Sequence, residues 1–199
     1  IDNITKQSGH ISNIFSSTEL GMMKSMLLKA EMTKGYQTGS THNNVQVSEH
    51  YGVDQKSIVY PWIKKLILSK TKKHFGSFDI CFVSLNNSHE PFGIHFDHHI
   101  HEKLQLNGQY YFSFLIPLSV EDDQSKCDLA STIIFDSYDL KDRQQNAVQY
   151  HQDLLSHCKL HDLQKVNIQK IYNWSYGKLI WWDSKLLHAS GSFNNFNNK

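Results

Sequence analysis

Hydrophobic spacing divides the chain into a helical first part and a β-rich remainder. Apolar residues recur at helical spacing after Ser16-Ser17-Thr18-Glu19, in which Ser16 and Glu19 have the N-cap and N3 positions of a capping box. This pattern predicts an amphipathic helix that ends near Gly35. A second helix is predicted to run to about His74, with Pro61 in its first turn, where proline is tolerated. Its expected apolar face comprises Ile58, Val59, Trp62, Ile63, Leu66 and Ile67.

After Gly76 the hydrophobic period becomes that of short strands. Runs rich in β-branched and aromatic residues, separated by turn residues, favour an antiparallel sandwich or barrel. The expected strands are 78–85, 92–97, 110–118, 132–135, 178–182 and 186–190, with one further short strand near 45–47. An insertion at 140–161 is compatible with a polar surface helix. We therefore predict one domain over residues 1–199, with a helical elaboration at 1–76 and a β core at 77–199.

Composition narrows the possible partners. A formal net charge of +1 gives no electrostatic feature for nucleic acid or for anionic lipid. The three cysteines, Cys81, Cys127 and Cys158, are odd in number and form no C-x-x-C pair, which argues against a disulfide framework and a thiolate zinc site. No apolar run approaches the roughly 20 residues needed to cross a bilayer. A reducing cytoplasm is the expected setting, and the oligomeric state is left open.

A carboxylate and an imidazole stand two residues apart in Pro91-Phe92-Gly93-Ile94-His95-Phe96-Asp97-His98. On a strand, His95 and Asp97 would point to one side, with Ile94 and Phe96 on the other. A carboxylate directed into a barrel beside an imidazole is costly unless a positive charge compensates it, and a divalent cation does so. His95 and Asp97 are therefore candidate metal ligands.

A third ligand is expected from a distant strand. In the segment from Gly177 to His188, an apolar strand, a polar turn at Asp183-Ser184-Lys185 and a second apolar strand lead to His188, with Leu187 and Ala189 facing away. Two histidines and one carboxylate on one face of a metal, with the other positions open, form the facial triad of non-haem Fe(II) oxygenases. A buried hydrogen-bonded His/Asp group without metal is the alternative for the same residues.

The H-x-D pair, the long gap and the Gly-strand-D-S-x-x-x-H unit resemble the 2-oxoglutarate/Fe(II)-dependent dioxygenase superfamily, including its phytanoyl-CoA-hydroxylase-like and prolyl-hydroxylase-like branches. The resemblance covers residues 78 to 199. It implies a double-stranded β-helix, that is a cupin-like jelly roll, with the N-terminal helices packed on one sheet. It also implies Fe(II), O₂ and 2-oxoglutarate as cofactor and cosubstrates, and metal ligation by His95, Asp97 and His188.

The same resemblance suggests how 2-oxoglutarate would be held. In these families a hydroxyl two residues after the distal histidine and a basic residue about ten residues after it often bind the far carboxylate, and Ser190 and Lys199 have these positions. A lysine would neutralise the carboxylate as a point charge. The anchor is Lys199 or a residue beyond it. Tyr110 and Tyr111, on the strand after the first ligand pair, are candidates for a phenolic hydrogen bond.

The implied reaction is oxidative decarboxylation of 2-oxoglutarate to succinate and CO₂, coupled to hydroxylation of an unactivated C–H bond. A small molecule and a peptidyl side chain both remain open as substrate. Two rival functions keep the same fold: a cupin-like zinc or manganese hydrolase or isomerase, and a jelly-roll binding protein without catalysis. His98, His99 and His101 are expected in a solvated loop, Trp181 and Trp182 in the core and its flank, and Asp183 in a turn.

Overall fold

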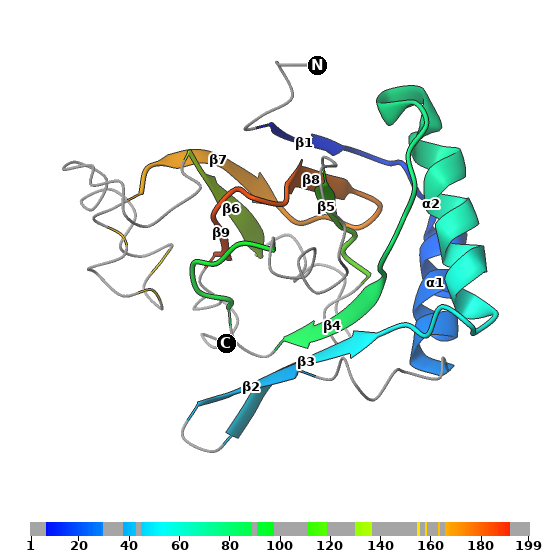
Figure 1. Ribbon diagram of the computed structural model, residues 1–199, viewed down its shortest axis with the longest axis horizontal. Helices are drawn as coiled ribbons and strands as arrows, with labels where there is room; N and C mark the ends of the chain where they lie inside the picture. The colour runs from blue at the N-terminus through cyan, green and yellow to red at the C-terminus, as the bar shows by residue number, and fades with distance from the viewer. Residues whose placement is uncertain are drawn as a thin grey trace. The chain divides into compact units, whose positions relative to one another are not determined.

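The computed structural model describes residues 7–29, 38–42, 45–88, 91–97, 111–118, 130–136, 155, 158, 163 and 166–191 (Figure 1). The chain forms two compact units. One comprises Ile14–Glu90, and the other joins Ile1–Asn13 to Pro91–Lys199. The described secondary structure consists of antiparallel sheets and two helices. A mainly β fold with flanking helices was predicted, and that class is confirmed.

The predicted capping box begins the first helix. Helix α1 spans Ser17–Lys29. The Glu19 carboxylate accepts hydrogen bonds from the Ser16 backbone N–H at 2.8 Å and from its hydroxyl at 2.9 Å, while the Glu19 N–H donates to Ser16 Oγ at 3.2 Å. Lys70 Nζ on the second helix lies 2.7 Å from Glu19 Oε1. The amphipathic pattern is confirmed by three buried residues, Leu20, Met23 and Leu27.

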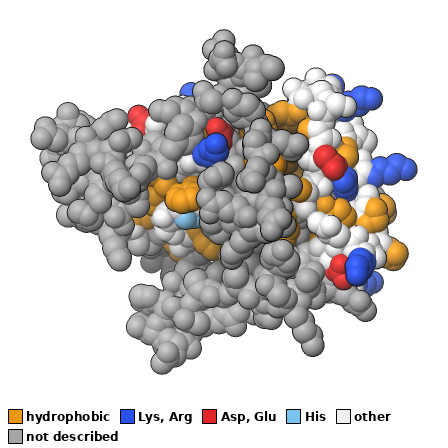
Figure 2. All heavy atoms as spheres, viewed as in Figure 1, with side chains coloured by type: hydrophobic (Ala, Val, Ile, Leu, Met, Phe, Trp, Pro, Cys, Tyr) orange, Lys and Arg blue, Asp and Glu red, His pale blue; other side chains and the backbone are white. Residues whose placement is uncertain are grey.

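Helix α2 spans Val59–Phe75, with Pro61 in the first turn as predicted. Its buried residues are Val59, Tyr60, Ile63, Ile67 and Thr71. The expected apolar face was wrong at Ile58, which is 82% exposed because it precedes the helix as the N-cap residue. The helix ends at Gly76, where a φ of 72° favours glycine and the backbone N–H donates to the carbonyl of Lys72. In Figure 2, acidic and basic side chains lie side by side on the unit Ile14–Glu90, which contains both helices.

The same unit contains a three-stranded antiparallel sheet in the order β2-β3-β4, formed by Thr38–His42, Val45–Gly52 and Ser84–Ser88. The short strand predicted near 45–47 is therefore present and longer. The strand predicted at 78–85 begins only at Ser84. Before it, the carbonyls of Ile80 and Cys81 accept hydrogen bonds from the Tyr60 hydroxyl and the Gln55 amide, and the carbonyl of Val83 accepts from the Val53 N–H.

The other unit contains two three-stranded antiparallel sheets. The first has the order β1-β8-β5, formed by Ser8–Ile11, Leu179–Asp183 and Phe112–Leu115. The second has the order β7-β6-β9, formed by Ile168–Asn173, Ser131–Phe135 and His188–Ser190. The strands predicted around β5, β6, β8 and β9 are confirmed. Strands β1 and β7 were not predicted, because β1 is polar and β7 buries only Tyr172.

Side-chain alternation places a hydrophobic cluster on each face of β6. Ile134 packs with Tyr172, Ile180, Trp182 and Leu186, so this cluster joins the two sheets. Ile133 and Phe135 point the other way, into a cluster with Leu155, Leu163, Val166, Leu187 and Ala189. Strand β6 is buried along its whole length because both of its faces are covered. Leu155, from the insertion expected to be a polar surface helix, is 1% exposed.

A glycine is required at position 9 in β1, because the Trp181 indole approaches the backbone closely there. It lies opposite Trp181 in the β1–β8 register, and a Cβ atom at this position would come within 2.8 Å of the Trp181 indole. The absence of a side chain lets the indole lie across the edge strand.

Neither described helix is long and apolar enough to cross a membrane.

The ion pair at Glu19 predicts a pH-dependent stability. The Lys70 ammonium and the Ser16 N–H hold the pKa of Glu19 down, from 4.5 to about 2. Because the folded-state pKa is depressed, the stabilisation is complete above pH 4.5 and is lost as the pH falls toward 2. Glu19→Gln keeps the capping geometry and removes the charge, so it should lower the free energy of unfolding by up to about 1 kcal/mol at pH 7. Urea denaturation should show wild type and variant converging near pH 2, and a pH-independent gap would contradict the assignment.

Candidate metal centre

The segment 92–97 was predicted as a strand and is not one. It forms a single isolated bridge, in which the His95 N–H donates to the carbonyl of His188 at 2.9 Å and the His188 N–H donates back at 2.8 Å. On either side of this bridge, the Ser190 N–H donates to Phe92 O and the Asp97 N–H donates to Ser184 O, both at 3.1 Å. The ladder is irregular because Ser184 lies in the turn before β9. The predicted convergence of His95 and Asp97 on one side nevertheless holds.

The turn that delivers His188 was predicted and is confirmed. Asp183 Oδ1 accepts a hydrogen bond from the Lys185 N–H at 3.0 Å, and the Leu186 N–H donates to the Asp183 carbonyl at 2.9 Å. This arrangement is the turn-stabilising role expected of Asp183. Leu187 and Ala189 point into the cluster behind β6, so His188 points to the opposite face.

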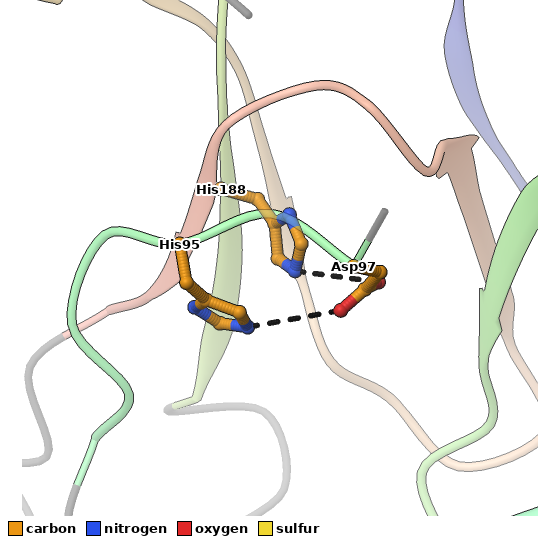
Figure 3. Close-up of side chains that lie close together, drawn as sticks. All are labelled: His95, Asp97 and His188. Atoms are coloured by element: carbon orange, nitrogen blue, oxygen red, sulfur yellow. Dashed lines mark ion pairs between the residues drawn. The ribbon is translucent and has the colours of Figure 1, made fainter. Parts of the chain in front are cut away.

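Figure 3 shows the side chains of His95, Asp97 and His188 pointing toward one another. His95 Nε2 lies 3.9 Å from Asp97 Oδ1, and His188 Nε2 lies 3.6 Å from Asp97 Oδ2. One candidate ligand atom from each residue lies within 4.8 Å of the others, a spacing that could hold a metal ion. The two imidazole centroids are 4.2 Å apart, with the ring planes inclined by 55°. The structure thus brings together the three residues singled out in the sequence.

Each histidine is oriented by its own backbone. His95 Nδ1 lies 2.8 Å from the Gly93 carbonyl, and His188 Nδ1 lies 3.0 Å from the Leu186 carbonyl, in both cases the carbonyl two residues earlier. A carbonyl oxygen only accepts hydrogen bonds, so each Nδ1 carries the proton in the neutral ring. Each Nε2 therefore presents a lone pair toward Asp97, as a metal-ligating histidine does.

This arrangement is electrostatically unfavourable without a positive charge. Two acceptor nitrogens face a carboxylate at 3.6 and 3.9 Å, beyond the range of a hydrogen bond. Burial lowers the pKa of His188 to about 4, so its imidazole is neutral at pH 7 despite the opposing effect of Asp97. Neutral imidazoles and an ionised carboxylate are the protonation states that a divalent cation requires. The donor set therefore fits a metal ion.

Asp97 is oriented by a hydroxyl on another strand. Ser113, on β5, donates a hydrogen bond from Oγ to Asp97 Oδ2 at 2.5 Å. Ser113 pairs with Trp182 across the sheet, and the Trp182 ring lies 4.8 Å from that of His188. Sequence reasoning missed Ser113, because a serine in an apolar strand gives no signal until its cross-strand neighbours are known.

The site has a buried and an exposed side. The His188 side chain is 6% exposed, whereas that of His95 is 39% exposed and lies beside Phe92. Ser190 is buried in β9 and pairs with Thr132. Tyr110, Lys199, His98, His99 and His101 lie outside the described residues, so their predicted roles stay predictions. Trp182 belongs to the core as expected, and Trp181 is half-buried at its flank.

No protein-family model and no curated protein matches the sequence. Among solved structures, the chain is similar to the non-heme alpha ketoglutarate dependent epimerase SnoN from nogalamycin biosynthesis, with a TM-score of 0.50 and 12% identity over 94% of this chain and 72% of that chain. A SnoN complex with Fe3+, alpha ketoglutarate and nogalamycin RO gives a TM-score of 0.47 at 12% identity, over 94% and 73%. At 12% identity, the similarity to the first SnoN structure is a similarity of fold alone.

Removing a candidate ligand should abolish metal binding. His188→Ala and Asp97→Ala are each expected to lose the bound divalent ion, because a three-residue site with one ligand missing retains little affinity. Elemental analysis and calorimetric titration with Mn²⁺ would measure the loss. His74→Ala, at an exposed position on α2, is the matched control. Unchanged metal content in His188→Ala would contradict the site.

Ser113 is expected to strengthen metal binding without coordinating the metal itself. Ser113→Ala removes the hydrogen bond that orients Asp97 and is expected to weaken Mn²⁺ binding about ten- to hundredfold, as loss of outer-shell partners generally does. Ser113→Thr retains the hydroxyl and should restore most of the affinity. Equal affinities in the alanine and threonine variants would show that this hydrogen bond does not matter for the metal.

Proposed function

We propose that the protein is an Fe(II)- and 2-oxoglutarate-dependent oxygenase. The observation that carries the proposal is the convergence of His95, Asp97 and His188, with both Nε2 atoms facing one carboxylate. Two imidazoles and one carboxylate that leave other coordination positions open are the ligand set of non-haem iron oxygenases. The fold likeness to SnoN, an alpha ketoglutarate dependent enzyme, supports the same class.

The two antiparallel sheets form part of a double-stranded β-helix in this proposal. The order β1-β8-β5 packs against β7-β6-β9 through the cluster around Ile134 and Trp182, as the two sheets of a jelly roll do. The metal ligands lie at the edge next to β9. The phytanoyl-CoA-hydroxylase-like and prolyl-hydroxylase-like branches are the proposed relatives.

Within such a site, residues of the chain would orient the ligands and shield one side of the metal from solvent. His188 would form the buried wall, because its side chain is 6% exposed, its ring lies beside that of Trp182 and its Nδ1 is fixed by Leu186 O. His95 lies on the more exposed side, from which a substrate would approach. Bound Fe(II) with 2-oxoglutarate would supply O₂-dependent oxidation of a substrate C–H bond, releasing succinate and CO₂. Ser190, with Lys199 and Tyr110, is proposed to bind the cosubstrate.

The outcome at the substrate carbon is proposed to be hydroxylation. Epimerisation is the second candidate, favoured by the fold likeness to an epimerase. The two differ in product mass, because hydroxylation adds one oxygen atom and epimerisation adds none. A cupin-like hydrolase or isomerase that uses zinc or manganese is the rival class, and it would not consume 2-oxoglutarate.

An anaerobic titration tests the proposal. Protein loaded with Fe(II) should develop a weak visible charge-transfer band when 2-oxoglutarate is added, and exposure to O₂ should release succinate. Asp97→Ala should show neither signal, whereas His74→Ala should behave as wild type. A folded, iron-loaded wild type that shows no band and no succinate would exclude this function, and zinc or manganese in the purified protein would then favour the rival class.

A further inference from the structure

The described polar side chains of Ser8, Ser113 and Trp174 are hydrogen-bonded within the protein, whereas the Trp182 indole N–H is not paired with a described residue. Ser8 Oγ lies 2.9 Å from Tyr172 Oη, Ser113 Oγ donates to Asp97, and Trp174 Nε1 donates to Thr132 Oγ1 at 2.8 Å. Trp182 Nε1 is buried and has no hydrogen-bond partner among the residues that the structure describes. An unpaired buried donor costs roughly 1–3 kcal/mol, so native proteins rarely leave one without a purpose.

The position of Trp182 explains why its neighbours do not satisfy this donor. Trp182 stands on the central strand β8, opposite Ser8 on one side and Ser113 on the other. These two hydroxyls are the polar side chains that flank it in the register, and both are engaged, with Tyr172 and with Asp97. The buried cluster that contains the indole includes Ile134, Ile180 and Leu186, and the hydroxyl of its Tyr172 is paired with Ser8.

Trp182 is also next to the candidate metal centre. Its ring centroid lies 4.8 Å from that of His188, with the planes inclined by 49°. Through Ser113 it is one cross-strand pair away from the group that orients Asp97. The indole therefore lies beside one candidate ligand, His188, and its strand position is opposite Ser113, whose hydroxyl orients the other, Asp97. Pairing on both edges of β8 fixes its backbone, and burial of 94% of the residue fixes its side chain.

We infer that the Trp182 indole N–H is a recognition donor for a carboxylate oxygen of the small organic acid that binds beside the metal. The inference rests on the proposed function, in which that acid is 2-oxoglutarate. An indole N–H only donates, so it selects an acceptor and cannot be satisfied by an ammonium or guanidinium group. In a site shielded from water, a hydrogen bond to an ionised acceptor is about twice as strong as one between neutral groups.

The test uses Zn²⁺-loaded protein, which is diamagnetic and does not turn over. The sequence has four tryptophans, so a ¹H–¹⁵N spectrum should contain four indole signals. Addition of 2-oxoglutarate should move the signal that is missing in Trp182→Phe downfield. Calorimetry should show that Trp182→Phe, which keeps an aromatic ring against His188, binds Zn²⁺ as wild type does and 2-oxoglutarate about ten- to hundredfold more weakly.

Trp181→Phe is the matched control, because it makes the same change one residue away on the opposite face of β8. It should leave the affinity for 2-oxoglutarate unchanged. Equal 2-oxoglutarate affinity in wild type and Trp182→Phe, or an indole signal that does not move, would overturn the inference and leave the proposed function standing. Failure of Zn²⁺-loaded wild type to bind 2-oxoglutarate would overturn both. If Trp182→Phe does not fold, the indole signal of wild type, assigned by replacing the other three tryptophans, decides the question.

Discussion

Two backbone hydrogen bonds between His95 and His188 hold the candidate metal centre together. They connect segments that are 93 residues apart in the sequence, and they set which side chains share a face. A shift of one residue along β9 would replace His188 by Leu187 or Ala189, both of which now fill the cluster behind β6. The register of this one bridge therefore determines whether the three polar side chains meet or are separated.

The orientation of the ligands comes from two different sources. Each imidazole is fixed locally, because its Nδ1 faces the carbonyl two residues earlier in its own segment. The carboxylate is fixed by tertiary contact, since Ser113 donates a hydrogen bond to Asp97 from β5. The result is a carboxylate faced by the Nε2 atoms of two imidazoles. A cation bound between these atoms would stabilise the arrangement.

The burial of β6 on both faces explains how such a polar group is tolerated. One face packs on the other sheet and the opposite face packs on Leu155, Leu163 and Val166, so β6, the strand that supports β9, is buried along its length. Several polar side chains of these strands are nevertheless buried or half-buried. The hydroxyls of Ser8 and Ser113 and the indole of Trp174 are paired within the protein, and the indole of Trp182 is buried next to His188.

Local signals in the sequence were sufficient for the elements whose cause is local. The capping box at Ser16 and Glu19, the turn at Asp183, and the short apolar runs of β6 and β8 depend on neighbours a few residues away, so they were predicted correctly. The residues His95, Asp97 and His188 could be named because their chemistry is unusual in apolar strands. Only the tertiary structure decided that their donor atoms converge. It also decided that 92–97 is a bridged segment instead of a strand, and that β1 and β7 exist, because edge strands with little apolar surface owe their conformation to the partners with which they pair. The roles of Ser113 and Trp182 likewise follow from cross-strand register, which a single sequence does not contain.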